Sequence, residues 1–296
     1  MNAPIYPDSR EITLDDKPMF DMMFERMQPR ISEFTFAGLY LFRNAHSYRL
    51  TGCEDSMVIL GKGYDGNEYF LPPLEGNIAA ALGKLLSEGM LLYGADEVFV
   101  DRYLGRLEGI VIEEDRDAFD YLYRRMSLAE LPGNRYHKKK NRINYFMSRY
   151  SSRIEPYSRW HLDGALSLLE EWRAVRSGVD SRSFDAEVEA AAEGLHLADR
   201  LGLTGVVVLV ADRIRAFALG ERLNAFTSVC HFEKADPFLE GIYQLVDREF
   251  NRLCYTDCMY VNREQDLGEP NLRKSKLSYH PVELVKKFRV KREMTR

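Results

Sequence analysis

The sequence predicts an α+β protein built from two copies of one structural unit. In each half, two amphipathic helical stretches precede a group of short strands, and a further helix and strand follow. A length of 296 residues is enough for two domains of ordinary size. The composition, 45% hydrophobic and 29% charged, is typical of folded globular proteins. We expect a first domain at 1–125, a basic connecting helix at 126–150 and a second domain at 151–296.

The second half shows the order of elements most clearly. The apolar run GVVVLVA predicts a buried strand, and Asp236 followed by Pro237 is typical of a helix start. Beyond Pro237, apolar residues recur at helical spacing as far as Leu253. The predicted elements are a strand at 152–157, helices at 162–172 and 184–201, strands at 205–211, 214–221 and 225–233, a helix at 237–253, a strand at 258–262, a short helix at 270–278 and a strand at 284–290.

The first half follows the same order with weaker signals. Its segments share the topology of the second half but not its sequence. The predicted elements are helices at 17–27 and 32–42, strands at 48–51, 57–60 and 68–71, a helix at 77–86 and a strand near 98–100.

The composition and the motifs argue against several classes of protein. No apolar run approaches the roughly 18 residues of a membrane span, and residues 1–20 lack the apolar core of a signal peptide. Among four cysteines, only Cys254 and Cys258 are close in sequence, without a histidine at ligand spacing. No GxSxG, P-loop, GxGxxG or HExxH motif occurs. We therefore expect a cytoplasmic protein with reduced thiols, no metal and no covalently bound cofactor.

The positive charge is concentrated in local patches. The net charge is −5, yet five cations and no carboxylate lie within Arg135–Arg142. On a helix, His137, Asn141 and Asn144 would share one face beside an apolar face. Two interpretations stay open, namely an ordinary solvated helix face or a surface that binds an anion. In the second, we expect His137 and Lys139 to face the ligand and the two asparagines to hold the halves of the protein together.

Two long blocks of sequence resemble a known family. They are DYLYRRMSLAELPGNRYHKKKNRINYF (120–146) and the segment from HFEKAD to VNREQDLGEPNLRKSKLSYHP (231–281). Both resemble the phosphatidylglycerol lysyltransferase C-terminal-domain-like family, in its soluble branch. The resemblance covers nearly the whole chain and implies two tandem GCN5-related N-acetyltransferase (GNAT) folds, each a mixed, mostly antiparallel sheet flanked by helices. Better understood relatives transfer an amino acid from aminoacyl-tRNA to a lipid or to a peptidoglycan precursor.

One segment departs from the usual GNAT pattern. The loop that would hold the pyrophosphate of acetyl-CoA should lie at 233–241, where this sequence has EKADPFLEG. Backbone amides hold a pyrophosphate only where side chains leave room, and this segment has one glycine and three carboxylates. The sequence therefore argues against ordinary acetyl-CoA binding in the second domain.

The candidate site residues lie at strand ends and on the basic stretches. Strand alternation would place His231 and Glu233 on one face of the sheet and Lys234 on the other. A partly buried carboxylate can act as a general base toward an acceptor amine, and the resemblance supports this role. A surface ion pair, a hydrogen-bonded turn and a solvated helix are the structural alternatives. We assign Glu233, Glu264 and His231 to catalysis, Asn262, Arg263, Asp266 and Tyr279 to substrate binding, and His137, Lys139, Lys234, Arg273 and Lys276 to the phosphates of the donor.

Two functions are compatible with these residues. The first is transfer of an acyl or aminoacyl group from a CoA-like or aminoacyl-tRNA donor to an amine or hydroxyl acceptor. Such a transfer needs positioning, a base and donors for the developing oxyanion, and it needs no metal. The second is a degenerate transferase that only binds a phosphate-bearing ligand or RNA, which the glycine-poor loop favours. A steep salt dependence of RNA affinity without turnover would indicate the binding protein.

Overall fold

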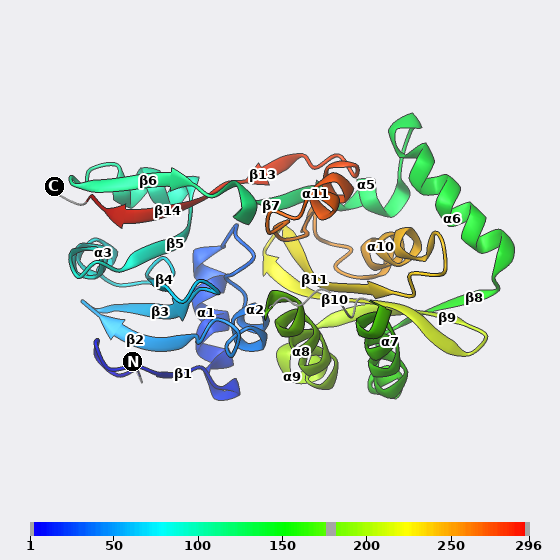
Figure 1. Cartoon of the computed structure of the whole chain (residues 1–296), viewed down its shortest axis with the longest axis horizontal. Helices are drawn as coiled ribbons and strands as arrows, with labels where there is room; N and C mark the ends of the chain where they lie inside the picture. Colours follow the sequence, from blue (N-terminus) through cyan, green and yellow to red (C-terminus); the bar gives the residue numbers. More distant parts are fainter. Residues whose placement is uncertain (1–2, 176–181, 294–296) are drawn as a thin grey trace. The chain divides into compact units, whose positions relative to one another are not determined.

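The computed structural model describes residues 3–175 and 182–293, which form two compact units (Figure 1). The first unit contains the chain up to Asp120, residues 265–270 and the segment from Leu284 onward. The second unit contains residues 121–264 and 271–283. Both consist of a mixed sheet with helices, so the predicted α+β class is confirmed.

The first unit is built on a seven-stranded sheet in the order β1-β2-β3-β4-β5-β14-β6. Strands β4 and β5 are parallel and are joined by α3, whose apolar side buries Leu82 and Leu85 against Phe70 and Leu92. The elements are β1 (Arg10–Glu11), η1 (Leu14–Asp16), α1 (Lys17–Met27), α2 (Phe36–Leu41), β2 (Arg49–Cys53), β3 (Ser56–Lys62), β4 (Glu68–Phe70), α3 (Ile78–Ser87), β5 (Leu91–Asp96), α4 (Glu97–Phe99), η2 (Val100–Leu104), β6 (Ile110–Glu114), η3 (Arg116–Ala118) and β14 (Lys287–Arg292).

The second unit is built on a sheet in the order β13-β7-β12-β11-β10-β9-β8. Helices α7 and α8 cover one face and α10 covers the other (Figure 1). The elements are β7 (Asp120–Arg124), α5 (Arg125–Glu130), η4 (Asn134–Tyr136), α6 (His137–Arg149), β8 (Ser152–Pro156), η5 (Arg159–His161), α7 (Leu162–Val175), α8 (Arg182–His196), α9 (Ala198–Leu201), β9 (Thr204–Val210), β10 (Arg213–Asn224), β11 (Thr227–Ala235), α10 (Ile242–Leu253), β12 (Tyr260–Asn262), α11 (Pro270–Leu277) and β13 (Glu283–Val285).

A shared motif accounts for the repeat of topology that the sequence predicts. In the second unit, β11 and β12 are parallel and are joined by α10, as β4 and β5 are joined by α3 in the first. Antiparallel strands precede each of these crossovers. A parallel pair needs a long crossover connection, and a helix is its usual form.

Two predicted elements differ from the structure because acidic side chains cap other segments. The strand expected near 98–100 is helical, since the Asp96 carboxylate accepts a hydrogen bond from the Phe99 N–H at 2.8 Å and starts a helix. Asp236 does not begin α10. Its carboxylate accepts from the Phe238 N–H at 2.9 Å and closes a turn, and the helix starts at Ile242.

The C-terminal strand departs from the expected division of the chain. Strand β14 pairs with β5 and β6 in the sheet of the first unit, although the sequence places residues 151–296 in one domain. Lys287 explains the placement, because its buried ammonium contacts Asp120 at 2.7 Å and both carboxylate oxygens of Glu33 at 2.6 and 2.7 Å. Strands β1, β6 and β7 were also not predicted; β1 and β6 lie at the edges of the first sheet.

Within residues 3–175 and 182–293, no helix combines the length and the apolar character needed to cross a bilayer.

Candidate functional site

Strand β11 distributes its polar side chains over the two faces of the sheet as the alternation predicts. Lys234 points toward α7 and α8, where its buried ammonium pairs with Glu187 and lies 4.3 Å from the ring centroid of Trp172. Glu233 points to the opposite face, which carries α10. Lys234 is thus separated from the other predicted donor-binding residues of this unit, and its contacts support a structural role.

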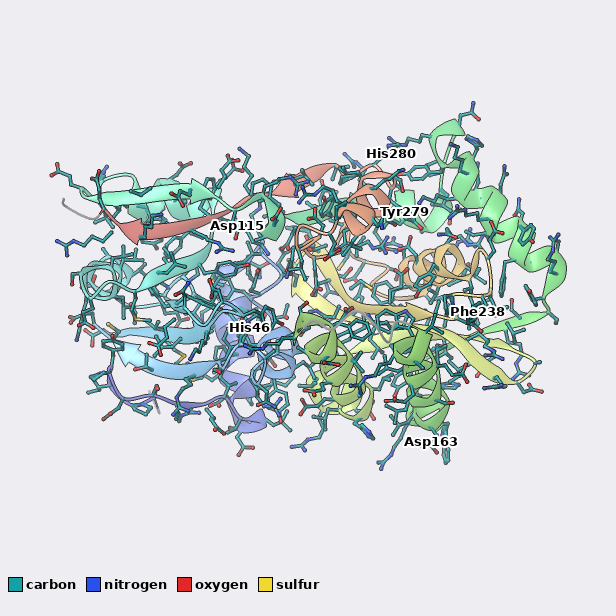
Figure 2. The ribbon with its side chains drawn as sticks, viewed as in Figure 1. His46, Asp115, Asp163, Phe238, Tyr279 and His280 are labelled. Atoms are coloured by element: carbon teal, nitrogen blue, oxygen red, sulfur yellow. The ribbon has the colours of Figure 1, made fainter. Side chains whose placement is uncertain are left out.

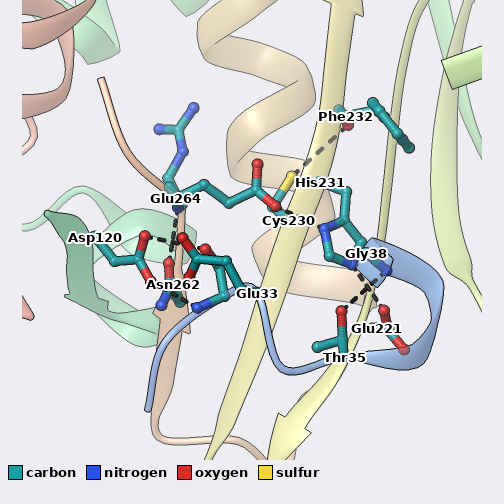
Figure 3. A network of polar contacts seen from close by, with 12 residues as sticks. Glu33, Thr35, Gly38, Asp120, Glu221, Cys230, His231, Phe232, Asn262 and Glu264 are labelled. Atoms are coloured by element: carbon teal, nitrogen blue, oxygen red, sulfur yellow. Dashed lines mark hydrogen bonds and ion pairs between the residues drawn. The ribbon is translucent and has the colours of Figure 1, made fainter. Parts of the chain in front are cut away.

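His231 lies between two carboxylates (Figure 3). Its Nδ1 is 2.7 Å from Oε1 of Glu264, and its Nε2 is 2.8 Å from Oε1 of Glu221. Burial by itself lowers the pKa of His231, but the hydrogen bonds to Glu221 and Glu264 outweigh it and raise this pKa to about 10. The imidazole is therefore a cation at neutral pH and is not available as a general base.

The turn after β12 presents Glu264 to His231. Glu264 has a left-handed backbone with φ of 56°, and its N–H donates to Oδ1 of Asn262 at 2.7 Å. The Lys276 ammonium donates to the carbonyls of Arg263 at 2.5 Å and Glu264 at 3.1 Å. Asn262 and Lys276 were predicted to bind substrate and phosphate. These contacts instead place both residues in the support of the turn.

A second group of charges surrounds Arg263. Its Nη2 is 2.7 Å from Oε2 of Glu233, and its Nη1 is 3.1 Å from Oδ1 of Asp247 on α10. Burial raises the pKa of Glu233 to about 7, with Arg263 opposing the shift and Asp247 adding to it. Burial also raises the pKa of Asp247. The two carboxylates share one guanidinium, which leaves Glu233 able to gain and lose a proton near neutral pH.

Lys139 on α6 extends this group of charges. Its Nζ is 2.7 Å from the Ser278 hydroxyl and 3.8 Å from the ring centroid of Tyr279, which also lies 5.1 Å from the Arg263 guanidinium. Tyr279 follows α11 and is almost fully buried (Figure 2). Burial lowers the pKa of Lys139 to about 8. The structure thus brings together Lys139, assigned from the sequence to the donor, and Tyr279 and Arg263, assigned to the substrate.

The rest of the basic stretch follows the solvated interpretation. His137 is exposed, and its Nδ1 is 2.8 Å from the Asn134 carbonyl. Asn141 and Asn144 are also exposed, so the expectation that they satisfy buried groups between the halves is wrong. The buried side of α6 is apolar instead, and its anchoring residues are Tyr136, Ile143 and Phe146.

Asp266 and Arg273 are the remaining residues of the predicted site. Asp266 belongs to the first unit, where its buried carboxylate accepts from the Gly268 N–H at 2.9 Å and lies 3.3 Å from Arg116. It is therefore not grouped with the residues of the second unit. Arg273 is half-buried on α11.

Two carboxylates of the site were not identified from the sequence. Asp247 lies on the buried side of α10, four residues after Tyr243 and three before Phe250. A carboxylate at core spacing on a helix is a usable signal, because such a group needs a buried partner. Glu221 on β10 has no comparable local signal.

The residues present do not fit a CoA pyrophosphate at α10. A Cβ atom placed on Gly241, just before α10, would lie 2.1 Å from the Arg142 carbonyl oxygen of α6. Helix α6 therefore covers the start of α10, where backbone amides would otherwise meet a phosphate. Within the described residues, no group of three or more His, Cys, Asp or Glu side chains could hold a metal ion.

The close contact between Gly241 and α6 leads to a first prediction, with Gly133 as the control. Gly133→Ala is expected to lower the free energy of unfolding by about 1–3 kcal/mol, because Gly133 has φ of 73° and ψ of −173°, a conformation nearly confined to glycine, and nothing lies within 4 Å of its Cβ position. Gly241→Ala should cost about 1–3 kcal/mol more, because its methyl group also meets the Arg142 carbonyl. Urea denaturation measures both. Equal losses would contradict the packing of α6 on Gly241.

Comparisons with known proteins agree with this architecture. The chain is 25% identical over 203 residues to an uncharacterized protein of Mycoplasmoides gallisepticum, a match that spans 64% of this chain and 64% of that protein. A conserved protein of unknown function from Bacteroides thetaiotaomicron is 29% identical and has a TM-score of 0.87, with 95% of this chain and 98% of that chain covered.

The structure is also similar to L-PGS from Bacillus licheniformis. The TM-score is 0.63 at 12% identity, with 100% of this chain and 95% of that chain covered. At this identity the similarity shows the fold, and the expected architecture of two mixed sheets flanked by helices is confirmed. The family model described as phosphatidylglycerol lysyltransferase, C-terminal, matches residues 24–291, and the chain therefore belongs to this family.

Proposed function

We propose that the protein transfers an aminoacyl group from an activated ester to an amine or hydroxyl acceptor, with Glu233 as the general base. The observation that carries this proposal is the partly buried Glu233 beside Arg263, whose pKa of about 7 suits proton transfer at neutral pH. The membership of the phosphatidylglycerol lysyltransferase C-terminal family supports the same reaction class.

An ester donor is favoured over CoA by the packing of α6. The Arg142 carbonyl occupies the space beside Gly241, and the preceding segment carries Glu233, Asp236 and Glu240. A CoA pyrophosphate would meet this negative charge and a covered helix start. An aminoacyl ester at an RNA 3′ end does not need that position.

The fixed charges near Glu233 suit the two ends of such a substrate. Glu264 has one carboxylate oxygen on His231, while Oε2 has no hydrogen-bond partner in the described part of the chain and its side chain is 24% exposed. This oxygen is suited to a substrate ammonium. Arg263 lies 2.7 Å from Glu233, and Lys139 shares the Tyr279 ring with Arg263, so both cations are suited to the negative charge of the donor or of the oxyanion.

A second candidate function is binding of RNA without catalysis. The exposed side of α6 carries Lys138, Arg142 and Arg149, which make no ion pair within residues 3–175 and 182–293. Such a surface binds phosphates through long-range attraction, with an affinity that falls steeply as salt increases.

Mass spectrometry of reaction mixtures separates the two functions. Purified protein is incubated with aminoacyl-tRNA pools and with amine and hydroxyl acceptors, including phosphatidylglycerol vesicles. Turnover of one aminoacyl ester that depends on Glu233 would support the transferase. RNA binding with a steep salt dependence and no turnover of any ester would support the binding function.

Lys139 offers a more local prediction. Lys139→Ala is expected to weaken binding of a short RNA ending in CCA by about 1–3 kcal/mol, because its half-buried ammonium can make a charge-assisted hydrogen bond. The matched control is Lys138→Ala, an exposed neighbour on the same helix, with a change of at most about 0.5 kcal/mol. Calorimetric titration measures both affinities. Equal effects of the two substitutions would favour the broad basic surface.

A further inference from the structure

The contacts of His231 determine its protonation state without reference to any reaction. A neutral imidazole has one N–H donor and one acceptor nitrogen. Here both ring nitrogens face carboxylate oxygens, at 2.7 Å for Glu264 and 2.8 Å for Glu221. An acceptor nitrogen would be repelled by the carboxylate opposite it. Both nitrogens therefore carry hydrogens, and the ring is an imidazolium.

Glu221 is the more rigid of the two partners. It lies in the middle of the sheet on β10, paired with Val229 of β11, and its side chain is 10% exposed. Glu264 lies on a turn, and its side chain is 24% exposed. Within the described residues, Glu221 makes no other ion pair. Its contacts thus serve His231 alone.

Two further titratable groups near these residues, Tyr255 and Cys230, add no charge. The Tyr255 hydroxyl donates to the Gly220 carbonyl at 2.7 Å, and burial raises the pKa of this tyrosine. Burial likewise raises the pKa of Cys230 on β11. Both stay neutral at physiological pH. The group of Glu221, His231 and Glu264 then has a net charge of −1, and the free oxygen of Glu264 presents it.

We propose that Glu221 is a positioning residue, which keeps His231 protonated so that the imidazolium holds Glu264 by one oxygen. The other oxygen of Glu264 then accepts a hydrogen bond from a primary ammonium group of the substrate. Only this second step rests on the proposed transferase function. Without Glu221, the imidazole loses a proton near neutral pH and accepts at one nitrogen, and Glu264 loses its anchor.

Side-chain nitrogen NMR tests the first step in the free protein. In the wild type, both ring nitrogens of His231 should remain protonated at pH 8, and Glu221→Gln should lower the pKa of His231 by about 3 units, from about 10 to near neutral pH. His161 is an internal reference, because the Ser158 N–H donates to its Nδ1 at 3.1 Å, which marks that nitrogen as an acceptor. A neutral His231 in the wild type at pH 8 would overturn the proposal, whatever the activity.

The pH profile of transfer tests the second step. Glu221→Gln should reduce kcat/KM about tenfold at pH 8.5, mainly through KM, and much less at pH 6, where the imidazole regains its proton. Glu221→Asp keeps a carboxylate and should recover part of the loss. A loss that is equal at both pH values would show a merely structural role and overturn the proposal. If NMR shows the imidazolium but no ester is turned over, the role of Glu221 toward His231 stands and the proposed transferase function fails.

Discussion

Glu233→Gln is expected to reduce kcat for aminoacyl transfer by about 10²–10⁴-fold, the usual contribution of a general base. The amide keeps the size of the side chain and can still accept a hydrogen bond from Arg263, but it cannot take a proton from the acceptor. In the wild type, the rate should rise with pH through about 7, where Glu233 ionises. Initial rates between pH 5.5 and 8.5 would test both expectations.

The Glu233→Gln variant should remain folded. The raised pKa of Glu233 gives the sign of its effect on stability. Glu233 has a higher pKa in the folded protein than the usual 4.5, so the folded state binds a proton more tightly than the unfolded chain. Its contribution to stability is thus greatest below about 4.5 and is lost as the pH rises through about 7. A neutral glutamine at pH 8 should not lower the melting temperature. The matched control is Glu240→Gln, an exposed carboxylate in the next segment, which should retain the rate. A Glu233→Gln variant that keeps its activity would refute the role of Glu233 as the general base.

Lys287→Met is expected to lower the free energy of unfolding by about 3–5 kcal/mol, because it leaves two buried carboxylates without their cation. Lys287 has no exposed side-chain surface, and it contacts Glu33 and Asp120 at 2.6–2.7 Å. Lys286→Met is the matched control, since its ammonium is 40% exposed and its pairs with Glu97 and Glu114 lie at the surface. The control should cost at most about 1 kcal/mol. Urea denaturation of both variants measures the difference.

The pH dependence of the Lys287→Met variant provides a second check. Burial raises the pKa of Glu33 to about 7 even beside Lys287, so this carboxyl takes up a proton readily. Protonation at pH 5 removes part of the uncompensated charge in the variant. The loss of stability should therefore be smaller at pH 5 than at pH 8. A loss that is small at pH 8 as well would contradict the role of Lys287 in holding β14 to the first unit.

The sequence could predict those features of the candidate site that depend on local geometry. Alternation along β11 placed Glu233 opposite Lys234, and their contacts agree, but a register shift between Cys230 and Phe232 interrupts the alternation at His231. His231 and Glu264, both assigned to catalysis from the sequence, lie 2.7 Å apart. Strand period and motif position are properties of consecutive residues, so they can be inferred from the chain alone.

The carboxylates that pair with His231 and Arg263 could not be inferred from consecutive residues. Glu221 and Asp247 lie 10 and 16 residues from His231, on a different strand and on a helix, and only the packing of these elements brings them to His231 and Arg263. The protonation of His231 follows from that packing. Its burial alone would lower the pKa, and the two carboxylates reverse the direction.

The sequence by itself determined the α+β class, the repeated order of elements, the family and the glycine-poor segment at 233–241. Local propensity, strand period and motif carry this information. The tertiary structure alone decided that α6 covers the start of α10, that β14 joins the first sheet and that His231 is a cation. Each of these depends on pairings between distant segments, whose free energies depend on burial and charge in the folded state rather than on neighbouring residues.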